Sequence, residues 1–341
     1  MATEVVRVIA LTAAVRPGYA HPMNRDDFPG PAPTALHVHQ YLGLQPGPKL
    51  IVLGGVHGDE TCGTVALRRL VDALEAGRLQ LRRGELTLVP VSNPMAHQAG
   101  RREGQRNLNR RLLPVAIPQD HEDRIARVLC PLLARHEVLL DLHSFHTDGE
   151  PFVMIGPRDN DGPLEPFRHE AAETALAAVL GVRQVVEGWL EAYARGVARR
   201  GGDAQYGIGT TEYMRSVGGW GLTLECGRHD DPAAPEVAWQ ATLRTLEHLG
   251  LIDAGASAPC TQPDFEVMRL VDVIDREAEG DRLARNWCSF DPVRAGEVIG
   301  WRADGREVLA PADGRVVFPN PRARAGAEWF YLAELSGRRL G

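Results

Sequence analysis

The clearest pattern along the chain is a set of three short apolar runs that each lead into polar residues. The runs cover residues 50–53, 138–140 and 222–224, and Gly, His, Asp and Glu are frequent just after them. A continuous run of Val, Leu and Ile of this length predicts a strand that is buried on both faces. Such strands belong to sheets that helices cover on both sides, so the pattern predicts an α/β fold.

The remainder of the first 250 residues alternates between strand-like and helix-like patterns. Further strands are predicted near residues 5–11, 36–42, 86–91 and 151–155, and helices over 61–76, 120–135, 166–180 and 232–249. This alternation is typical of a sheet whose strands are joined by helical crossovers. In open α/β sheets, ligands bind beyond the carboxyl ends of the strands, so the polar residues that follow the apolar runs are expected to converge there.

The pattern changes after the last predicted helix. Residues 251–259 are mostly small and include Pro, and the helical period is lost there. Short alternating segments follow near residues 265–274, 297–301, 307–309 and 315–318, with turns between them. We therefore expect a catalytic α/β domain over residues 1–256 and a small all-β domain over residues 257–341.

Composition and charge exclude several classes of protein. The net charge is −7, which argues against a nucleic-acid partner because phosphate binding depends on clustered Lys and Arg. No apolar stretch approaches the roughly 18 residues that cross a bilayer, and the first residues do not resemble a signal peptide, so we expect a cytoplasmic protein without a membrane partner. The five cysteines are scattered, which fits neither a disulfide framework nor a thiolate zinc site. Cys226, next to Glu225, stays open as an alternative nucleophile.

Four residues that follow the apolar runs form a candidate catalytic set. His57 and Glu60 lie three positions apart after the first run, and His143 ends the second run, so the three can hold one ion. Two His and one carboxylate suit a catalytic Zn²⁺, one per chain, whose fourth position is left for water. Glu225 ends the third run, where it can act as general base and then as general acid. The alternatives are structural: core histidines at positions 57 and 143, and a salt-bridged Glu225.

A polar segment over residues 93–111 is too rich in Arg and Asn to be a core element. Arg presents a planar fork that matches a carboxylate, and Asn adds an uncharged donor and acceptor. The segment is therefore interpreted as a binding loop for a small anionic substrate. A solvated basic loop without a ligand is the alternative.

Together these motifs resemble the succinylglutamate desuccinylase and aspartoacylase family. The matching motifs, in family order, are Gly55-x-His57-Gly58-Asp59-Glu60, Asn93-Pro94, Asn107-Leu108-Asn109-Arg110, Asp141-Leu142-His143 and Thr223-Leu224-Glu225-x-Gly227. The resemblance covers most of the chain. It implies a zinc-dependent amide hydrolase with the zinc carboxypeptidase fold, in which a mixed sheet lies between helices and a small β domain follows.

The resemblance also implies a role for individual residues. His57, Glu60 and His143 are then the zinc ligands, and Glu225 is the general base. By position in the family pattern, the residues that hold the substrate carboxylate are Arg102, Asn109 and Arg110. Arg215, ten positions before the catalytic Glu, is the arginine that polarises the scissile carbonyl and steadies its oxyanion.

The chain departs from the family pattern in three places. Asp59 replaces the Asn that usually follows His-Gly, and Asn107 replaces the Asp that usually opens the Asp-Leu-Asn-Arg motif. The stretch 141–146, Asp-Leu-His-Ser-Phe-His, also differs from what the named enzymes lead us to expect. None of these changes removes a ligand, but each lies beside one and can alter hydrogen bonds or substrate choice.

The leading hypothesis is hydrolysis of the amide bond of a small N-acylated amino acid or a related compound. Two other readings stay open: a metallocarboxypeptidase that acts on short peptides, and a catalytically silent metal-binding protein that senses a ligand. The acyl group and the amine stay open, as does the oligomeric state, for which a homo-oligomer is one alternative.

Overall fold

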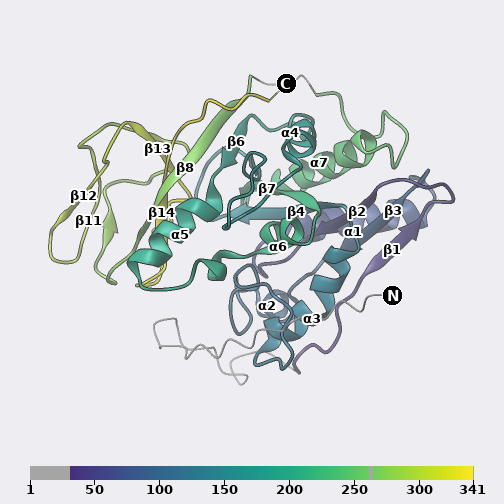
Figure 1. Cartoon of the computed structure of the whole chain (residues 1–341), viewed down its shortest axis with the longest axis horizontal. Coiled ribbons are helices and arrows are strands. Elements are labelled where there is room, and N and C mark those ends of the chain that lie inside the picture. The colour runs from purple at the N-terminus through teal and green to yellow at the C-terminus, as the bar shows by residue number, and fades with distance from the viewer. Residues whose placement is uncertain (1–30, 261–263, 341) are drawn as a thin grey trace, which may run out of the picture.

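The structure is a computed structural model that describes residues 31–260 and 264–340 (Figure 1). The strand predicted near residues 5–11 lies outside the described part of the chain. Within the described residues, eleven strands form one mixed sheet in the order β1-β3-β2-β4-β7-β5-β6-β8-β14-β13-β10, and three more form a separate small sheet in the order β12-β11-β9. The α/β fold with a mixed sheet is therefore confirmed.

The centre of the large sheet is parallel. Here β3 (Glu85–Val89), β2 (Lys49–Leu53), β4 (Val138–Phe145) and β7 (Trp220–Arg228) run side by side in the same direction. The three apolar runs over residues 50–53, 138–140 and 222–224 lie in β2, β4 and β7. Since parallel strands end at the same edge of a sheet, the polar residues that follow them are brought together at that edge.

Alternate side chains of the central strands face different helices. Leu50 and Val52 of β2 pack in one core with α1 (Cys62–Glu75) and α7 (Ala234–His248). Ile51 and Leu53 pack in a second core with α3 (His121–Ala134) and α6 (Thr210–Ser216). These four side chains of β2 are fully buried, and burial of one such side chain contributes about 1.5–3 kcal/mol. The expectation of strands buried on both faces is confirmed.

The predicted helix limits agree closely with the structure for α1, α3 and α7. The predicted helix over 166–180 is shorter in the structure, where α4 covers Glu170–Ala177. The short helices α2 (Pro94–Ala99) and α6 and the longer α5 (Trp189–Arg199) were not predicted. In the part of the chain that the structure describes, no helix is both long enough and apolar enough to span a bilayer.

The other half of the sheet is mixed. β1 (His39–Leu42) runs antiparallel to β3 at one edge, and β5 (Phe152–Met154) runs antiparallel to β7. β6 (Gln184–Glu187) is parallel to β5 and to β8 (Glu266–Asp275). The C-terminal region therefore begins by extending the sheet of the catalytic region.

The C-terminal region consists of short β-strands, as expected. After β8, the large sheet continues through β14 (Glu328–Leu335), β13 (Gly314–Val317) and β10 (Pro292–Val293), and the small sheet contains β9 (Arg282–Leu283), β11 (Val298–Trp301) and β12 (Glu307–Leu309). Its aromatic core includes Trp287, Trp329 and Phe330. We keep the division near residue 256 as a proposal, since α7 ends before it and β8 begins after it.

Candidate active site

The first polar residues of the site lie in the tight turn between β2 and α1. Gly55 has a positive φ of 57°, and a Cβ on Gly58 would lie 2.0 Å from the backbone carbon of Ala96. Only glycine fits so close to another backbone segment. The turn is thereby pressed against the start of the Arg-rich loop, and it holds His57 and Glu60 inside the protein, where they are 2% and 1% exposed.

The structure brings the three predicted metal ligands together. One oxygen of Glu60, Oε1, lies 2.8 Å from Nδ1 of His57, and the other, Oε2, lies 2.9 Å from Nδ1 of His143. The backbone N–H of Ser144 also donates to Oε2, at 3.1 Å. One potential ligand atom from each of the three residues lies within 4.8 Å of the others, which is the spacing that one ion requires. All three side chains are buried.

Each histidine is oriented by a second partner on its far side. Nε2 of His57 donates to Oδ1 of Asn107 at 3.0 Å, and that same oxygen accepts the backbone N–H of Asn109 at 2.8 Å. Nε2 of His143 donates to Oδ2 of Asp141 at 2.9 Å, and Thr210 donates its hydroxyl to the same carboxylate oxygen. Because these oxygens accept from the Nε2 atoms, each ring turns its Nδ1 atom toward Glu60.

Glu225 reaches the same edge from the neighbouring strand. In the register of β4 and β7, Glu225 lies directly opposite His143. Its Oε2 atom is buried and has no hydrogen-bond partner among the described residues. Burial raises the pKa of this carboxyl well above its ordinary value, although the nearby His143 acts in the opposite direction. A buried carboxyl group whose free oxygen faces the site is placed as an acid–base catalyst must be.

Cys226 has its side chain on the opposite face of β7 from that of Glu225. Its side chain belongs to the core between the sheet and helices α1 and α7, and burial raises the pKa of its thiol well above the usual range. A catalytic cysteine requires a lowered pKa and access to substrate. The alternative of a nucleophilic Cys226 therefore finds no support in its placement.

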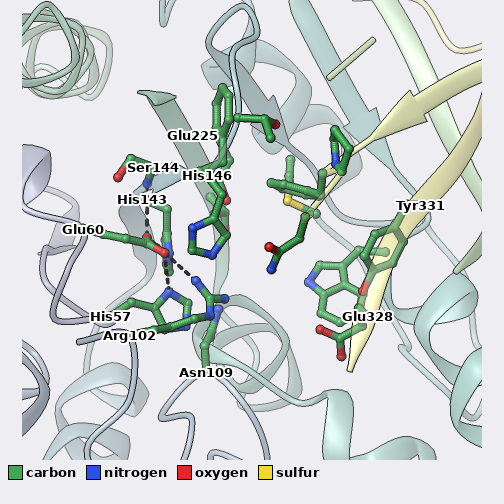
Figure 2. A pocket seen from close by; sticks show the side chains of 18 of the residues that line it. His57, Glu60, Arg102, Asn109, His143, Ser144, His146, Glu225, Glu328 and Tyr331 are labelled. Atoms are coloured by element: carbon green, nitrogen blue, oxygen red, sulfur yellow. Dashed lines mark hydrogen bonds and ion pairs between the residues drawn. The ribbon is translucent and has the colours of Figure 1, made fainter. Parts of the chain in front are cut away.

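A pocket of about 880 Å³ opens beside the three candidate ligands and Glu225. Figure 2 shows His57, Glu60 and His143 on one side of it and Glu328 and Tyr331 on the opposite side. All three residues expected to bind the substrate line this pocket, namely Arg102, Asn109 and Arg110. The predicted binding loop and the predicted metal ligands thus share one cavity.

The loop that carries these residues is anchored to the start of α3. The Glu122 carboxylate accepts the side-chain amide of Asn93 at 3.0 Å and the backbone N–H groups of Gln105 and Arg106 at 3.3 and 3.2 Å. The Arg106 guanidinium bonds to two carboxylates of the same helix region, at 2.8 and 2.9 Å. Arg106 is therefore a structural residue of the loop and has no free edge to offer a ligand.

The two arginines in the pocket differ in their surroundings. Arg102 is half-buried, and its Nη1 lies 2.6 Å from Oε1 of Glu60. Arg110 is buried, donates to Glu328 at 3.2 Å, and stacks on the rings of Trp189 and Tyr193 at 4.9 and 5.0 Å. Arg102 is thus the arginine beside the ligands, and Arg110 lies toward the opposite wall.

The structure does not place Arg215 in this pocket. Its guanidinium donates to Glu173 at 2.9 Å and to Glu165 at 2.8 Å, and it lines a second cavity away from His57 and His143. The side chain is 4% exposed, so these carboxylates hold it in the interior. Arg215 does not line the pocket of His57 and His143, because α6 directs it toward Glu173 of α4 rather than toward the ends of β4 and β7.

Loss of Arg215 is expected to affect stability rather than chemistry. Arg215→Ala leaves two carboxylates buried without their cation, which costs about 3–5 kcal/mol of unfolding free energy. Arg306→Ala, which removes an exposed partner of Asp304, is the matched control and should cost at most about 1 kcal/mol. Denaturant unfolding measures both. An Arg215 variant as stable as the parent but inactive would restore the catalytic role.

Several pocket residues were not singled out from the sequence. Trp189, Phe318, Glu328 and Tyr331 come from α5, from the turn after β13 and from β14, and they complete the pocket wall. No local motif marks them, because they enter the pocket only when the C-terminal strands join the large sheet. His146 was noted within an unusual stretch, and the structure places it in the pocket, 3.0 Å from His229.

The fold is that of solved succinylglutamate desuccinylase and aspartoacylase structures. Residues 46–195 match the family model of the succinylglutamate desuccinylase/aspartoacylase catalytic domain. The solved structure of a succinylglutamate desuccinylase/aspartoacylase from Rhodobacter sphaeroides superimposes with a TM-score of 0.67 at 20% identity, over 88% of this chain and 90% of that one. The resemblance to this family is therefore confirmed, with the family model matching residues 46–195.

Two further proteins are similar to this chain, an ectoine utilization protein and a deacetylase. The product-bound ectoine utilization protein EutE (DoeB) from Ruegeria pomeroyi has a TM-score of 0.67 at 20% identity, over 87% of this chain and 88% of that one. The N-alpha-acetyl-L-2,4-diaminobutyric acid deacetylase of Halomonas elongata is 38% identical over 109 residues. That alignment spans 29% of this chain and 29% of the relative.

Proposed function

We propose that the protein is a zinc-dependent deacylase that hydrolyses the amide bond of a small N-acylated amino acid or a related compound. The observation that carries the proposal is the buried His57, Glu60 and His143 cluster with the Glu225 carboxyl opposite it. The family model over residues 46–195 and the deacetylase relative support the same class of reaction.

The donor set fits a metal ion. The Nδ1 atoms of His57 and His143 face the two oxygens of Glu60 while asparagine and aspartate oxygens occupy both Nε2 atoms. A cation among these atoms would be held by Nδ1 of each ring and by the Glu60 carboxylate, and one potential ligand atom from each of the three residues lies within 4.8 Å of the others. Two His and one carboxylate are a common ligand set of catalytic zinc. A divalent metal held here polarises a carbonyl group and lowers the pKa of water.

The residues around the cluster supply the remaining chemistry. Glu225 takes a proton from the attacking water as the new C–O bond forms, and it delivers that proton to the nitrogen as the C–N bond breaks. The products are a carboxylic acid and a free amine. Arg102 offers a guanidinium next to Glu60, where it can stabilise negative charge on the reacting carbonyl oxygen, the role expected earlier of Arg215. Asn109 and Arg110 shape the substrate site.

The experiment is a mass-spectrometric screen of zinc-loaded protein against N-acetyl, N-succinyl and N-formyl amino acids, with unblocked dipeptides alongside. Release of a free amino acid and the matching acid from an acylated compound is the expected result. Cleavage of dipeptides alone would favour the carboxypeptidase reading. No product from protein shown to contain one zinc per chain, together with tight ligand binding, would favour the sensor reading.

A further inference from the structure

The wall of the pocket around Tyr331 and Glu328, opposite His57 and His143, includes a group of apolar side chains. These apolar side chains come from five separate segments, namely Met154, Trp189, Leu270, Phe318 and Tyr331, and the polar Asn320 lines the same pocket. The centroid of the Tyr331 ring lies 5.9 Å from the centroid of the Trp189 ring and 6.1 Å from that of the Phe318 ring, and both pairs are edge-to-face. This packing creates a surface that an aliphatic or aromatic group can cover, since such contact removes apolar area from water.

Phe318 is held on this wall at a conformational cost. Its φ of 52° lies in the left-handed region, which a bulky residue rarely adopts. The backbone N–H of Phe318 donates to the Ser289 hydroxyl at 3.1 Å, and the ring packs between Phe152 and Tyr331. Strain of this kind persists only where surrounding contacts require it. The fold thus maintains an aromatic side chain at this position of the pocket.

Charge at this end of the pocket is balanced. Arg110 donates to Glu328 at 3.2 Å, and the neighbouring Arg200 is paired with Asp275. Two cations therefore face two carboxylates. Among the described residues that line the pocket, Arg102 and Arg110 are the arginines, and Arg102 lies beside the metal ligands. The opposite wall thus has no excess positive charge to offer a second carboxylate.

Arg110 also has little freedom to leave its partner. Its Nη1 donates to the backbone carbonyl of Asn109 at 2.9 Å, and the guanidinium lies over the rings of Trp189 and Tyr193. A substrate side-chain carboxylate would have to approach Arg110 against the like charge of Glu328. A substrate ammonium group that approached Glu328 would be repelled by the like charge of Arg110, which is already bonded to Glu328. Such repulsive elements set specificity as much as attractive ones do.

We propose that this wall is a subsite for an uncharged aliphatic or aromatic side chain, and that Glu328 sets this preference by neutralising Arg110. The substrate is then an N-acylated neutral amino acid with one carboxylate, rather than an N-acyl aspartate, glutamate or diamino acid. The inference rests on the proposed deacylase function and narrows its substrate class.

The first test compares substrates in the parent protein. The values of kcat/KM are measured for the N-acetyl derivatives of leucine, methionine and phenylalanine, and for those of aspartate, glutamate and 2,4-diaminobutyrate, and the series is repeated with the acyl group that the parent accepts best. We expect the neutral substrates to be at least roughly tenfold better, a ratio typical of one apolar subsite. Faster cleavage of the acidic or diamino substrates would overturn the inference and leave the deacylase function standing. Cleavage of none of them would count against the function itself.

The second test removes the charge of Glu328. Glu328→Gln keeps an oxygen that can accept from Arg110 but leaves that guanidinium with an uncompensated charge. We expect the ratio of acidic to neutral substrates in kcat/KM to rise by roughly tenfold or more, because one repulsive charge is gone. An unchanged ratio in a variant with an unchanged melting temperature would refute the role of Glu328.

The matched control is Glu334→Gln. Glu334 lies on the same strand, β14, but is exposed and outside the pocket. This variant has the same change of net charge, so it should keep the substrate ratio of the parent protein. An equal shift in both variants would show that the effect is one of overall charge and would contradict the assignment to Glu328.

Discussion

Glu225→Gln is expected to lower kcat of the deacylation roughly 10²–10⁴-fold, which is the range that a general acid–base group contributes. Gln has the same shape as Glu but can neither accept the proton of the attacking water nor pass it to the amine. Because Glu225 Oε2 has no hydrogen-bond partner among the described residues, the substitution should not disturb the fold. Steady-state kinetics on the best substrate of the screen measure the effect.

The control for this variant is Glu236→Gln, which changes an exposed carboxylate at the start of α7. It should leave kcat within about twofold of the parent, since surface substitutions far from the site have small effects. Zinc content should equal that of the parent protein in both variants. Full activity in the Glu225 variant would remove this residue from the mechanism and would leave the proton transfer without a carrier.

His57→Ala is expected to weaken zinc binding by more than the roughly 10–100-fold that loss of an outer-shell partner costs, because it removes a direct ligand. Activity at limiting zinc should fall below detection. The remaining cluster of Glu60 and His143 offers two side chains where a catalytic zinc normally has three. Competition against a chelator of known affinity measures the loss of binding independently of turnover.

His248→Ala serves as the comparison, because His248 is an exposed histidine at the end of α7. Its zinc affinity and turnover should match those of the parent. If the His57 variant also kept the affinity of the parent, the metal would have to lie elsewhere, and the cluster at the ends of β2 and β4 would have another role.

Much of the fold follows from local patterns. The apolar runs of β2, β4 and β7 are long enough to identify buried strands, and α1 and α3 begin and end within one residue of the predicted limits. The helix α5 was not predicted although it has 11 residues, and the strand β6 was not predicted because it has only four. The parallel pairing of β6 with β8 joins residues about 80 positions apart, and no local pattern contains it.

The residues of the site also divide into those that local patterns predict and those that depend on distant partners. His57, Glu60, His143 and Glu225 could be located because each follows a buried parallel strand, and the sheet then brings them to one edge. Arg215 could not be placed in this way. Its direction is decided by Glu173 and Glu165, which lie 42 and 50 residues earlier in the chain and attract its guanidinium into the interior. The position of Arg215 in the sequence, ten residues before Glu225, does not predict these two partners.

The pairing of Glu328 with Arg110 in the pocket could not be predicted from the sequence either. Glu328 is one of many charged residues in the C-terminal region, and its meaning depends on Arg110, which lies 218 positions earlier. The binding loop predicted an anionic substrate from its arginines. The structure shows that three of these arginines, Arg102, Arg106 and Arg110, already have carboxylate partners. Counts of charged residues therefore overestimate the positive charge that a substrate meets.

We propose that the His57, Glu60 and His143 cluster holds one zinc ion that deacylation requires. This proposal is tested by a titration of metal-free protein with zinc, in which the amine product is followed by mass spectrometry. We expect no product without zinc and an initial rate that rises up to one equivalent of zinc per chain and then levels off. Full activity in the metal-free protein, or a filled site with no turnover of any acylated compound, would contradict it.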